Sequence, residues 1–308
     1  MSTNMYDVII AGGGGAGLTA ALYTSRAMLK TLLFEKLIPG GQIATTDMVE
    51  NYPGFPEGIM GAEISSRMEA QARKYGTEIQ YAPVETIEKT GSEIMIKSGA
   101  NRLTTKSLII AVGASFKMLG IPGEKELTGK GVSYCATCDG AFFKNKEIVV
   151  VGGGDSALQE GIFLTRFVKK LTILHRRDKL RGSPILQSRA KKNPKIEFLW
   201  DTILTKIEGT GKVERIQIKN VKTSQERFFD TNGVFIFVGH EPNTKFIQGL
   251  VQMDEKGYII TRENLGTSVP GIFACGEVRA GSTRQLVSAC GEGCEAALAA
   301  QAYLENLE

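Results

Sequence analysis

The stretch DVIIAGGGGAGLTAALYTSRAMLKTLLFEK, residues 7–36, decides the fold of this chain. It begins with a β-branched run and a glycine-rich loop, and it continues with a helical pattern of apolar residues and a second apolar run. Buried parallel strands joined by a helix have this pattern. The stretch EIVVVGGGDSALQEGIFLTRFVKKLTILHR, residues 147–176, aligns with the first without a gap, at an offset of 140 residues. The repeat predicts an α/β fold with two Rossmann-like dinucleotide-binding domains.

Both glycine loops match the fingerprint of a dinucleotide site. The fingerprint positions of the two loops are Gly12, Gly14 and Gly17, and Gly152, Gly154 and Ala157. The first position permits a tight turn, the second lets the backbone approach a pyrophosphate, and the third packs the helix on the strand. The N-terminus of the helix then faces the phosphates. A lone match is a weak signal, but two matches in the same strand–loop–helix context indicate two nucleotide sites.

The two copies differ at the end of the second strand, where a dinucleotide site contacts the adenosine ribose. The first copy has Glu35 there, and a carboxylate suits a free ribose 2′-hydroxyl. The second copy has His175, followed by Arg176, Arg177 and Arg181, and guanidinium groups suit a 2′-phosphate. We therefore expect FAD or NAD at the first site and NADP at the second. The alternative for the basic stretch is an ordinary strand-to-helix loop.

Further elements are expected outside the repeat. The sequence predicts a helix near residues 61–75 and a linker or solvent loop at residues 122–131. Strands are expected at residues 78–81, 93–97, 107–112, 195–199, 213–219 and 233–238. Residues 239–246 read as a return linker.

The end of the chain indicates that one domain is inserted into the other. It predicts a strand, a loop and a long helix, which have no partner sheet of their own. We expect these elements to complete the first domain, which then contains residues 1–116 and 245–308. The inserted domain would contain residues 117–244.

Composition limits the class of protein and its partners. Of the 308 residues 42% are apolar, and no apolar run approaches the ~20 residues that span a bilayer. The start, MSTNMYDVII, lacks the pattern of a signal peptide, and five cysteines do not suit a secreted disulfide scaffold. We therefore expect a cytoplasmic protein with no membrane partner. The basic residues between 166 and 195 form either a solvated face or a site for phosphate or an acidic partner, and no motif indicates nucleic acid.

A C-x-x-C pair lies between the two glycine loops. It consists of Cys135 and Cys138, with Asp139 directly behind them. A zinc site would need two more ligands, for which Cys290 and Cys294 are the candidate pair. A structural disulfide would close so short a loop that it constrains the unfolded chain little. We therefore favour a redox-active pair, in which Asp139 is a proton carrier or, alternatively, a helix cap.

Together these motifs resemble a known family. The segments CATCDG (135–140), GGGDSA (152–157), HRRDKLR (175–181), GHEPNT (239–244) and GIFACGEVRAGSTRQLVSACGEG (271–293) are similar to those of bacterial-type, low-molecular-weight thioredoxin reductases. The resemblance covers essentially the whole chain. It implies an FAD domain with an inserted NADPH domain, a homodimer, and thioredoxin or a similar small dithiol protein as partner.

The resemblance also implies site residues. The implied FAD contacts are Gly12, Gly14, Gly15, Ala16, Gly17, Glu35, Lys36, Gly40, Gly41, Gln42, Thr46, Asn51, Gly113, Gly276, Glu277, Arg284, Gln285 and Leu286. The implied NADPH contacts are Gly152, Gly154, Asp155, Ser156, His175, Arg176, Arg177 and Arg181. The long terminal helix would direct its N-terminus, the positive end of its dipole, at the flavin ring.

Three positions depart from the family pattern. Glu277 and Glu292 stand where the family usually has Asp, and Val112 stands where it tends to have Thr. Glu277 is expected to contact the sugar-like chain of the flavin. Its extra methylene group is therefore expected to shift the cofactor or weaken its binding.

The resemblance implies a reaction in three steps. NADPH gives a hydride to FAD, the reduced flavin reduces the Cys135–Cys138 disulfide, and the dithiol reduces a protein disulfide. Cys138 would face the flavin, Cys135 would attack the partner, and Asp139 would handle protons. Because one pair cannot easily lie both against the flavin and outside, the two domains are expected to rotate about their linkers.

Two other readings remain open. The same scaffold can serve another acceptor, such as a glutaredoxin-like protein or a peroxidase system, or it can run as a dithiol oxidase. A different class is a non-catalytic, nucleotide-binding redox sensor, which the intact C-x-x-C-D sequence disfavours.

Overall fold

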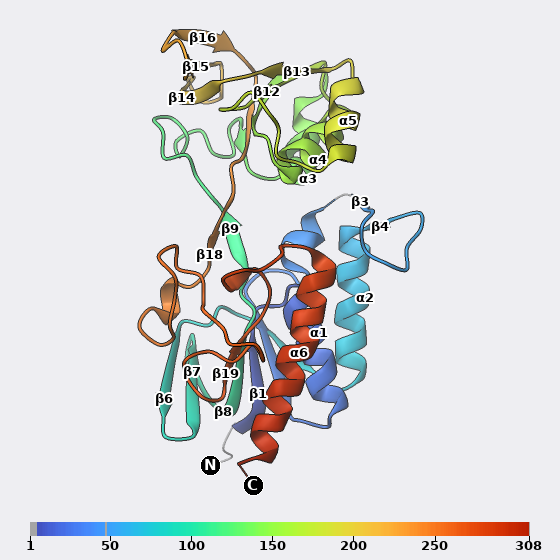
Figure 1. Ribbon diagram of the computed structural model, residues 1–308, viewed down its shortest axis with the longest axis vertical. Coiled ribbons are helices and arrows are strands. Elements are labelled where there is room, and N and C mark those ends of the chain that lie inside the picture. Colours follow the sequence, from blue (N-terminus) through green and yellow to red (C-terminus); the bar gives the residue numbers. More distant parts are fainter. Residues whose placement is uncertain (1–4, 47, 308) are drawn as a thin grey trace. The chain divides into compact units, whose positions relative to one another are not determined.

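The computed structural model describes residues 5–46 and 48–307, which form two compact units (Figure 1). Unit 1 contains the described residues up to Ser115 and from Glu241 onward, and unit 2 contains Phe116–His240. The return boundary expected from the sequence, after residue 244, thus falls four residues later than the boundary between the two units.

Unit 1 is built on a seven-stranded sheet in the order β5-β2-β1-β8-β7-β6, with β19 paired to the end of β8. Its strands are β1 (Met5–Ala11), β2 (Thr31–Glu35), β5 (Glu78–Tyr81), β6 (Thr86–Thr90), β7 (Glu93–Ser98), β8 (Asn101–Ile110) and β19 (Ile272–Ala274). Strands β5, β2, β1, β8 and β19 run parallel, and β6 and β7 are antiparallel. The terminal strand β19 therefore adds to the first sheet, although all of unit 2 lies between β8 and β19 in the sequence.

Both faces of this sheet are buried, which explains the continuous apolar runs of β1 and β2. Val8 and Ile10 pack in one cluster with α1 (Gly15–Arg26) and α6 (Leu286–Glu305). Ile9, between them, belongs to the cluster on the opposite face. Figure 1 shows α1 beside α6 and beside α2 (Gly61–Lys74).

Shorter elements of unit 1 lie in the loops. They are η1 (Gly41–Thr45), η3 (Lys245–Ile247), η4 (Gly276–Val278) and a two-stranded ribbon of β3 (Met48–Val49) and β4 (Ile59–Met60). The 3-10 helices η1 and η4 both carry residues that the sequence assigns to the flavin site.

Unit 2 is built on a five-stranded parallel sheet in the order β10-β17-β11-β12-β13. Its strands are β10 (Val132–Ser133), β11 (Glu147–Gly152), β12 (Lys170–Leu174), β13 (Ile196–Leu199) and β17 (Val234–Phe237). The helices are α3 (Ala136–Asp139), η2 (Gly140–Phe143), α4 (Asp155–Leu164) and α5 (Pro184–Lys192). A separate antiparallel sheet contains β14 (Thr202–Glu208), β15 (Arg215–Asn220) and β16 (Glu226–Asp230).

The internal repeat predicted from the sequence is confirmed. The order β5-β2-β1-β8 in unit 1 corresponds to β13-β12-β11-β17 in unit 2, and each unit places its glycine loop after the central strand. Such an order follows when each crossover between parallel strands is right-handed. The α/β class with two Rossmann-like units is therefore correct.

Residues 122–131 do not link the two units, but the alternative expectation of a solvent loop is confirmed in part, because the segment consists of turns and most of its residues are exposed. Two of its residues are nevertheless buried. Glu124 is 1% exposed and Leu127 is 6% exposed, and Leu127 belongs to a core cluster of unit 2. Proline, glycine and charged residues are typical of loops, but here backbone N–H groups compensate the buried carboxylate. The chain instead passes between the units at β9 (Ala114–Phe116) and β18 (His240–Pro242), which pair with each other.

The sequence also failed to predict β6, β14 and β16. Their side chains are largely polar or exposed, so they lack the apolar run that marks a buried strand. None of the helices in the described part of the chain combines the length and the apolar character needed to cross a membrane.

Candidate functional site

The first glycine loop connects β1 to α1 and has the properties that its fingerprint predicts. Gly12 has φ +106°, and a Cβ there would also collide with the main-chain oxygen of Ala111. A Cβ at Gly17 would collide with the oxygen of Gly12, so this glycine lets α1 pack directly on the end of β1. Gly14, the N-cap of α1, has no atom within 4 Å of its Cβ position. Open space therefore lies at the N-terminus of α1.

Glu35, at the end of β2, lies beneath this loop. Its side chain is buried, and Oε2 accepts a hydrogen bond of 2.8 Å from the N–H of Gly13. Oε1 accepts a bond of 3.0 Å from the N–H of Leu37. Because a carboxylate oxygen has two lone pairs, each oxygen can still accept a further hydroxyl. The next residue, Lys36, is exposed.

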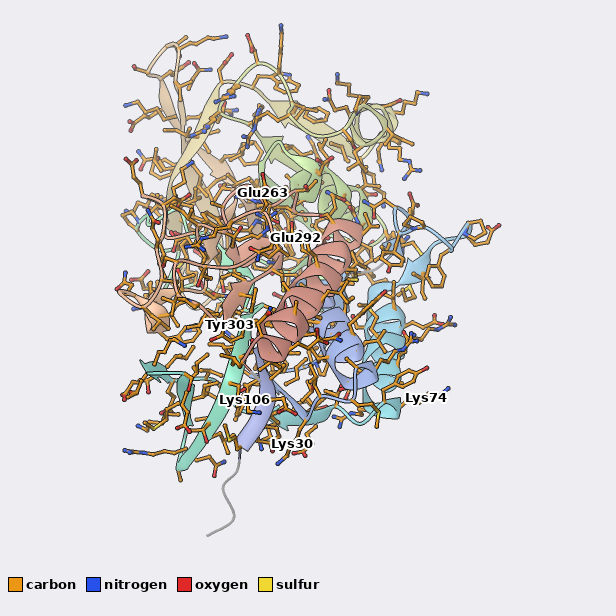
Figure 2. All side chains as sticks on the ribbon, turned by 60° about the horizontal axis from the view of Figure 1, so that its bottom comes forward. Lys30, Lys74, Lys106, Glu263, Glu292 and Tyr303 are labelled. Atoms are coloured by element: carbon orange, nitrogen blue, oxygen red, sulfur yellow. A yellow bond between two sulfur atoms is a disulfide. The ribbon has the colours of Figure 1, made fainter. Side chains whose placement is uncertain are left out.

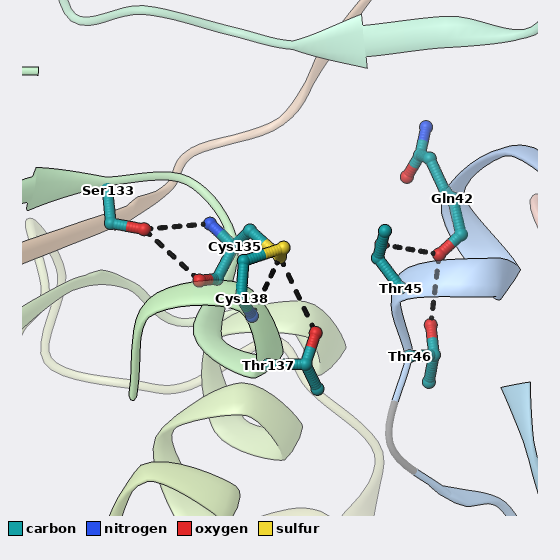
Figure 3. Close-up of a disulfide and its surroundings, with 7 residues drawn as sticks. All are labelled: Gln42, Thr45, Thr46, Ser133, Cys135, Thr137 and Cys138. Atoms are coloured by element: carbon teal, nitrogen blue, oxygen red, sulfur yellow. Dashed lines mark hydrogen bonds between the residues drawn. A yellow bond between two sulfur atoms is a disulfide. The ribbon is translucent and has the colours of Figure 1, made fainter. Parts of the chain in front are cut away.

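The segment that begins at Gly40 lies along the glycine loop. The N–H of Gly40 donates to the oxygen of Gly13 at 2.7 Å, and Gly14 and Gly40 form an isolated β-bridge. Gly41 follows in the left-handed region, and η1 begins with it. The hydroxyl of Thr46 then donates to the oxygen of Gln42 at 3.2 Å (Figure 3). These bonds place residues 40–46 next to the open end of α1.

Residues from the two ends of the chain meet at this site. Nε2 of Gln42 donates to Ala114 O at 2.7 Å and to Oε2 of Glu277 at 3.3 Å. Nδ2 of Asn51 donates to Oε1 of Gln285, the N-cap of α6, at 2.9 Å. The predicted contacts of the N-terminal and C-terminal segments therefore surround one site in unit 1.

The remaining residues assigned to the flavin lie partly in the helices α1 and α6 and partly in loops. Leu286, the first residue of α6, packs against Gly15, where it occupies the space of a Cβ. Ala16 is buried within α1. Arg284 has φ +59° and donates from Nη2 to the hydroxyl of Tyr258 at 3.2 Å. Gly113, on the way to β9, has φ +62° and open space at its Cβ position.

Glu292 supports the site in a way that the sequence did not predict. Its Oε2 accepts the N–H of Gly276 at 2.7 Å and pairs with Nε of Arg279 at 2.9 Å. Figure 2 shows Glu292 on α6. The carboxylate thus ties α6 to η4, the turn that carries Glu277. The one signal in the sequence was the departure from the family pattern at this position.

Cys275 is a packing residue, as its apolar surroundings suggest. Its side chain is fully buried. Burial, together with the nearby charge of Glu292, raises the pKa of the Cys275 thiol well above its ordinary value. The sulfur therefore stays protonated and unreactive.

The second glycine loop, between β11 and α4, repeats the arrangement of the first. A Cβ at Gly152 would approach Phe237 O, Gly154 has open space at its Cβ position, and Ala157 is fully buried. Oδ1 of Asp155 accepts the N–H of Ser183 at 2.7 Å and so joins the start of α4 to the following loop. Ser156 is exposed at the start of the helix.

His175 occupies the place under this loop that Glu35 occupies in unit 1. The residue is 4% exposed, and Nε2 of its ring lies 2.9 Å from Lys179 O. Gly153 packs on the ring so closely that a Cβ there would collide with it. Burial lowers the pKa of His175, and the charges of Arg181 and Arg177 lower it further, so the imidazole is neutral at pH 7.

The three arginines that are expected to bind a 2′-phosphate lie on the segment after β12, next to the second glycine loop. Arg176, Arg177 and Arg181 are exposed, and the N–H of Arg181 donates to Gly153 O at 2.7 Å. Asp178, the acid in their midst, pairs with Nζ of Lys222 at 3.5 Å. The guanidinium groups therefore present a concentrated positive charge beside the N-terminus of α4, where an anion is best accommodated.

Cys135 and Cys138 form a disulfide with an S–S distance of 2.07 Å (Figure 3). Cys135 is the N-cap of α3, and its Sγ accepts the N–H of Cys138 at 3.2 Å and lies 3.4 Å from Oγ1 of Thr137. Oγ of Ser133 accepts the N–H of Cys135 and donates to its oxygen, both at 3.1 Å. Cys138 is the more exposed cysteine of the two.

The alternatives for the C-x-x-C segment can be compared with this geometry. Sulfurs that are bonded to each other do not serve as thiolate ligands of zinc. Cys290 and Cys294, the second candidate pair, lie on α6 in unit 1, where Sγ of Cys290 contacts Gly15 O at 3.8 Å. The carboxylate of Asp139 forms no capping hydrogen bond at the start of η2, so the helix-cap reading is wrong.

Comparisons with known proteins agree with this geometry. The family model of the pyridine nucleotide-disulphide oxidoreductases matches residues 6–293. A thioredoxin reductase of Bacillus subtilis (strain 168) is 51% identical over 305 residues, which are 99% of this chain and 96% of that protein. The crystal structure of a Lactococcus lactis thioredoxin reductase has a TM-score of 0.96 at 47% identity, over 98% of this chain and 99% of that one. The crystal structure of a T. acidophilum thioredoxin reductase has a TM-score of 0.93 at 37% identity, over 99% of this chain and 100% of that one.

Proposed function

We infer that this chain is a thioredoxin reductase that draws its electrons from NADPH through FAD. The chain belongs to the pyridine nucleotide-disulphide oxidoreductase family and, within it, to the bacterial-type thioredoxin reductases. The observation that carries this conclusion is the Cys135–Cys138 disulfide, in a chain with two dinucleotide loops and full-length relatives of that name. The family supports an oxidoreductase with flavin and nicotinamide cofactors. The identity of each cofactor rests on the residues of each loop.

The residues of unit 1 fit FAD. The open N-terminus of α1 would receive the pyrophosphate, and Glu35 lies where a free ribose hydroxyl can donate to it. Gln42 and Glu277 are already joined by a hydrogen bond and would hold the sugar-like chain. When bound, FAD would transfer two electrons from the nicotinamide to the redox disulfide.

The residues of unit 2 fit NADPH. Gly154 leaves space for a pyrophosphate at the N-terminus of α4. Because His175 is buried and neutral, it supports the loop and leaves the 2′-phosphate to Arg176, Arg177 and Arg181. An acid at the position of His175 would instead repel that phosphate.

The contacts of the two sulfurs support distinct roles in thiol–disulfide exchange. A thiolate on Cys135 would keep the N–H of Cys138 and the hydroxyl of Thr137 as donors, which stabilise its negative charge. We therefore assign to Cys135 the attack on the disulfide of the acceptor, although Cys138 is the more exposed. The attack forms a mixed disulfide and releases one acceptor thiolate. Cys138 then attacks Sγ of Cys135, which restores the disulfide and releases the second acceptor thiolate.

Asp139 is proposed to carry protons in this exchange. Asp139→Asn keeps the size of the side chain and removes the proton carrier, so we expect the reduction of an oxidised acceptor to slow by ~10–100-fold. Steady-state kinetics with purified thioredoxin would measure this, and Asp230→Asn, an exposed acid of the same unit, is the control. An Asp139→Asn variant with the rate of the parent would refute the role.

Glu277→Ala is expected to weaken the binding of FAD. The variant loses a contact worth about 1–2 kcal/mol, which corresponds to a roughly 5–30-fold higher Kd. The ratio of flavin to protein absorbance after extensive dialysis measures the loss, and Glu263→Ala, an exposed acid of the same unit, is the matched control. Equal retention of FAD in the parent and in Glu277→Ala would show that Glu277 does not contact the flavin.

The acceptor is tested most directly with a panel of oxidised thioredoxins and glutaredoxin-like proteins. We expect a yellow protein that oxidises NADPH in the presence of thioredoxin. A colourless protein that does not oxidise NADPH would favour the sensor reading, and turnover with another dithiol protein alone would change the acceptor. We also propose that the protein is cytoplasmic and forms a homodimer. A sedimentation measurement of its mass in solution tests the dimer.

A further inference from the structure

Glu124 is a buried acid whose carboxylate is fully engaged within unit 2. The residue is 1% exposed. Oε1 accepts the N–H of Leu119 at 2.9 Å and the hydroxyl of Tyr134 at 2.7 Å. Oε2 accepts the N–H of Gly120 at 2.7 Å and that of Ile121 at 3.3 Å. Four donors on one carboxylate offset the large cost of burying its charge.

The two sides of this carboxylate join distinct parts of the chain. The backbone donors, residues 119–121, follow closely on β9, where the chain enters unit 2. The fourth donor, Tyr134, directly precedes Cys135. Glu124 therefore connects the entry segment of unit 2 to the redox disulfide by way of one side-chain hydrogen bond.

Tyr134 is held by both its ring and its hydroxyl. The ring packs against the core cluster that contains Leu127 and Val132, together with Leu119 and Ile121. Burial and the contact with Glu124 raise the pKa of the Tyr134 hydroxyl well above its ordinary value. The phenol therefore remains a proton donor to Glu124 throughout the neutral pH range.

The backbone of Cys135 is fixed on its N-terminal side by these contacts. Ser133 holds both the N–H and the oxygen of Cys135, and Tyr134, between them, is anchored to Glu124. Cys138, in contrast, lies at the exposed side of the four-residue helix α3. The distance between the two sulfurs thus depends on how firmly the Cys135 side is held.

We propose that Glu124 and Tyr134 are positioning residues for the redox disulfide, and that their hydrogen bond favours the disulfide over the dithiol by holding Cys135 at bonding distance from Cys138. Formation of the disulfide removes two protons and two electrons from the thiols and transfers them to an oxidant. A rigid Cys135 raises the effective concentration of one thiol at the other, because less conformational freedom remains to be lost. The proposal rests on the redox role of this pair, and it adds residues outside the C-x-x-C motif.

Tyr134→Phe tests the proposal, because it removes the hydroxyl and keeps the packed ring. The full-length flavoprotein is equilibrated in mixtures of reduced and oxidised dithiothreitol, where disulfide formation in the protein converts the oxidised reagent to its dithiol. After an acid quench and alkylation, mass spectrometry of the peptide with Cys135 and Cys138 gives the oxidised fraction. We expect the equilibrium constant for disulfide formation to fall 3–10-fold, which is about 15–30 mV for a two-electron couple.

A second variant and a double variant identify the bond. Glu124→Leu removes both acceptor oxygens and should change the equilibrium constant in the same direction as Tyr134→Phe. Because each variant removes the shared hydrogen bond, the double variant should differ from Glu124→Leu alone by less than twofold. A double variant whose effect is the product of the two single effects would contradict a shared bond. If Glu124→Leu does not fold, the comparison of Tyr134→Phe with its control still decides the proposal.

Tyr6→Phe is the matched control. It removes a hydroxyl-to-carboxylate bond of the same length, 2.7 Å, from Tyr6 to Glu78 in unit 1. The control should leave the equilibrium constant within twofold of the parent. The proposal is overturned if Tyr134→Phe also stays within twofold, or if Tyr6→Phe changes the constant as much. The measurement uses neither NADPH nor an acceptor protein, so it remains decisive if the thioredoxin reductase assignment fails.

Discussion

Cys138→Ser is expected to trap its acceptor protein as a covalent adduct, whereas Cys135→Ser forms none. In Cys138→Ser the remaining Cys135 can attack the acceptor, but the second thiol of the pair is absent and cannot resolve the mixed disulfide. In Cys135→Ser the sulfur that accepts the N–H of Cys138 is lost. Both variants should lose multiple-turnover reduction of the acceptor down to the background of the assay. A non-reducing gel after incubation of each reduced variant with oxidised thioredoxin measures the adduct.

Three results would change the assignment of the two sulfurs. An adduct with Cys135→Ser and none with Cys138→Ser would exchange the roles of the two residues. Full turnover in both variants would show that this disulfide is not the redox centre. The control is the variant with both serines, in which an adduct would point to one of the other cysteines, Cys275, Cys290 or Cys294.

The joint variant Arg176→Ala/Arg177→Ala is expected to lose its preference for NADPH. Each charge-assisted bond to the 2′-phosphate is worth ~1.5–3 kcal/mol, so two bonds correspond to a roughly 10²–10⁴-fold loss in kcat/KM for NADPH. NADH lacks that phosphate, so its kcat/KM should change by less than about threefold. Steady-state kinetics with both nucleotides measures the ratio.

The control for this prediction is Lys191→Ala/Lys192→Ala, which removes two exposed positive charges from α5 of the same unit. It should preserve the preference for NADPH, because general attraction of a nucleotide to a basic surface is weaker than a direct bond. Equal losses for NADPH and NADH in the arginine variant would mean that the arginines serve the loop itself. A loss of preference in the lysine variant would move the phosphate site to α5.

Local patterns in the sequence were sufficient for the repeated strand, loop, helix and strand at the centre of each unit. The β-branched runs of residues 7–11 and 147–151, the glycines behind them and the helical spacing that follows all express short-range rules. Such rules fix a strand, a turn and a helix within about 30 residues, and right-handed crossovers then fix the strand order. For the same reason the need for glycine at position 17 could be stated in advance, since its close contact is with Gly12 O in the same loop, whereas the approach of Ala111 O to Gly12 depends on the end of β8.

The sequence also singled out the side chains that we assign to the redox and nucleotide sites, because these residues lie in compact motifs. Cys135 and Cys138 are three positions apart, and Arg176, Arg177 and Arg181 follow one strand. Where the assignment needed residues from distant segments, it came from the resemblance to a family. No local pattern relates Gln42 to Glu277, although the two side chains share a hydrogen bond across 235 residues.

Tertiary structure alone decided the roles of the buried charged and titratable groups. The segment around Glu124 has the composition of a solvent loop, His175 has the sequence position of a ribose contact, and Glu292 is one acid on a helix of small residues. Each is buried, and partners close to it in the sequence satisfy it: backbone N–H groups and Tyr134 for Glu124, Lys179 O for His175, and Gly276 and Arg279 for Glu292. The free energy of a buried polar group depends on whether such partners are in place. Packing against the core of the unit decides whether the chain folds back so that these partners reach the group. The sequence therefore determines the elements and their motifs, whereas only the fold decides which charges are buried and what they hold.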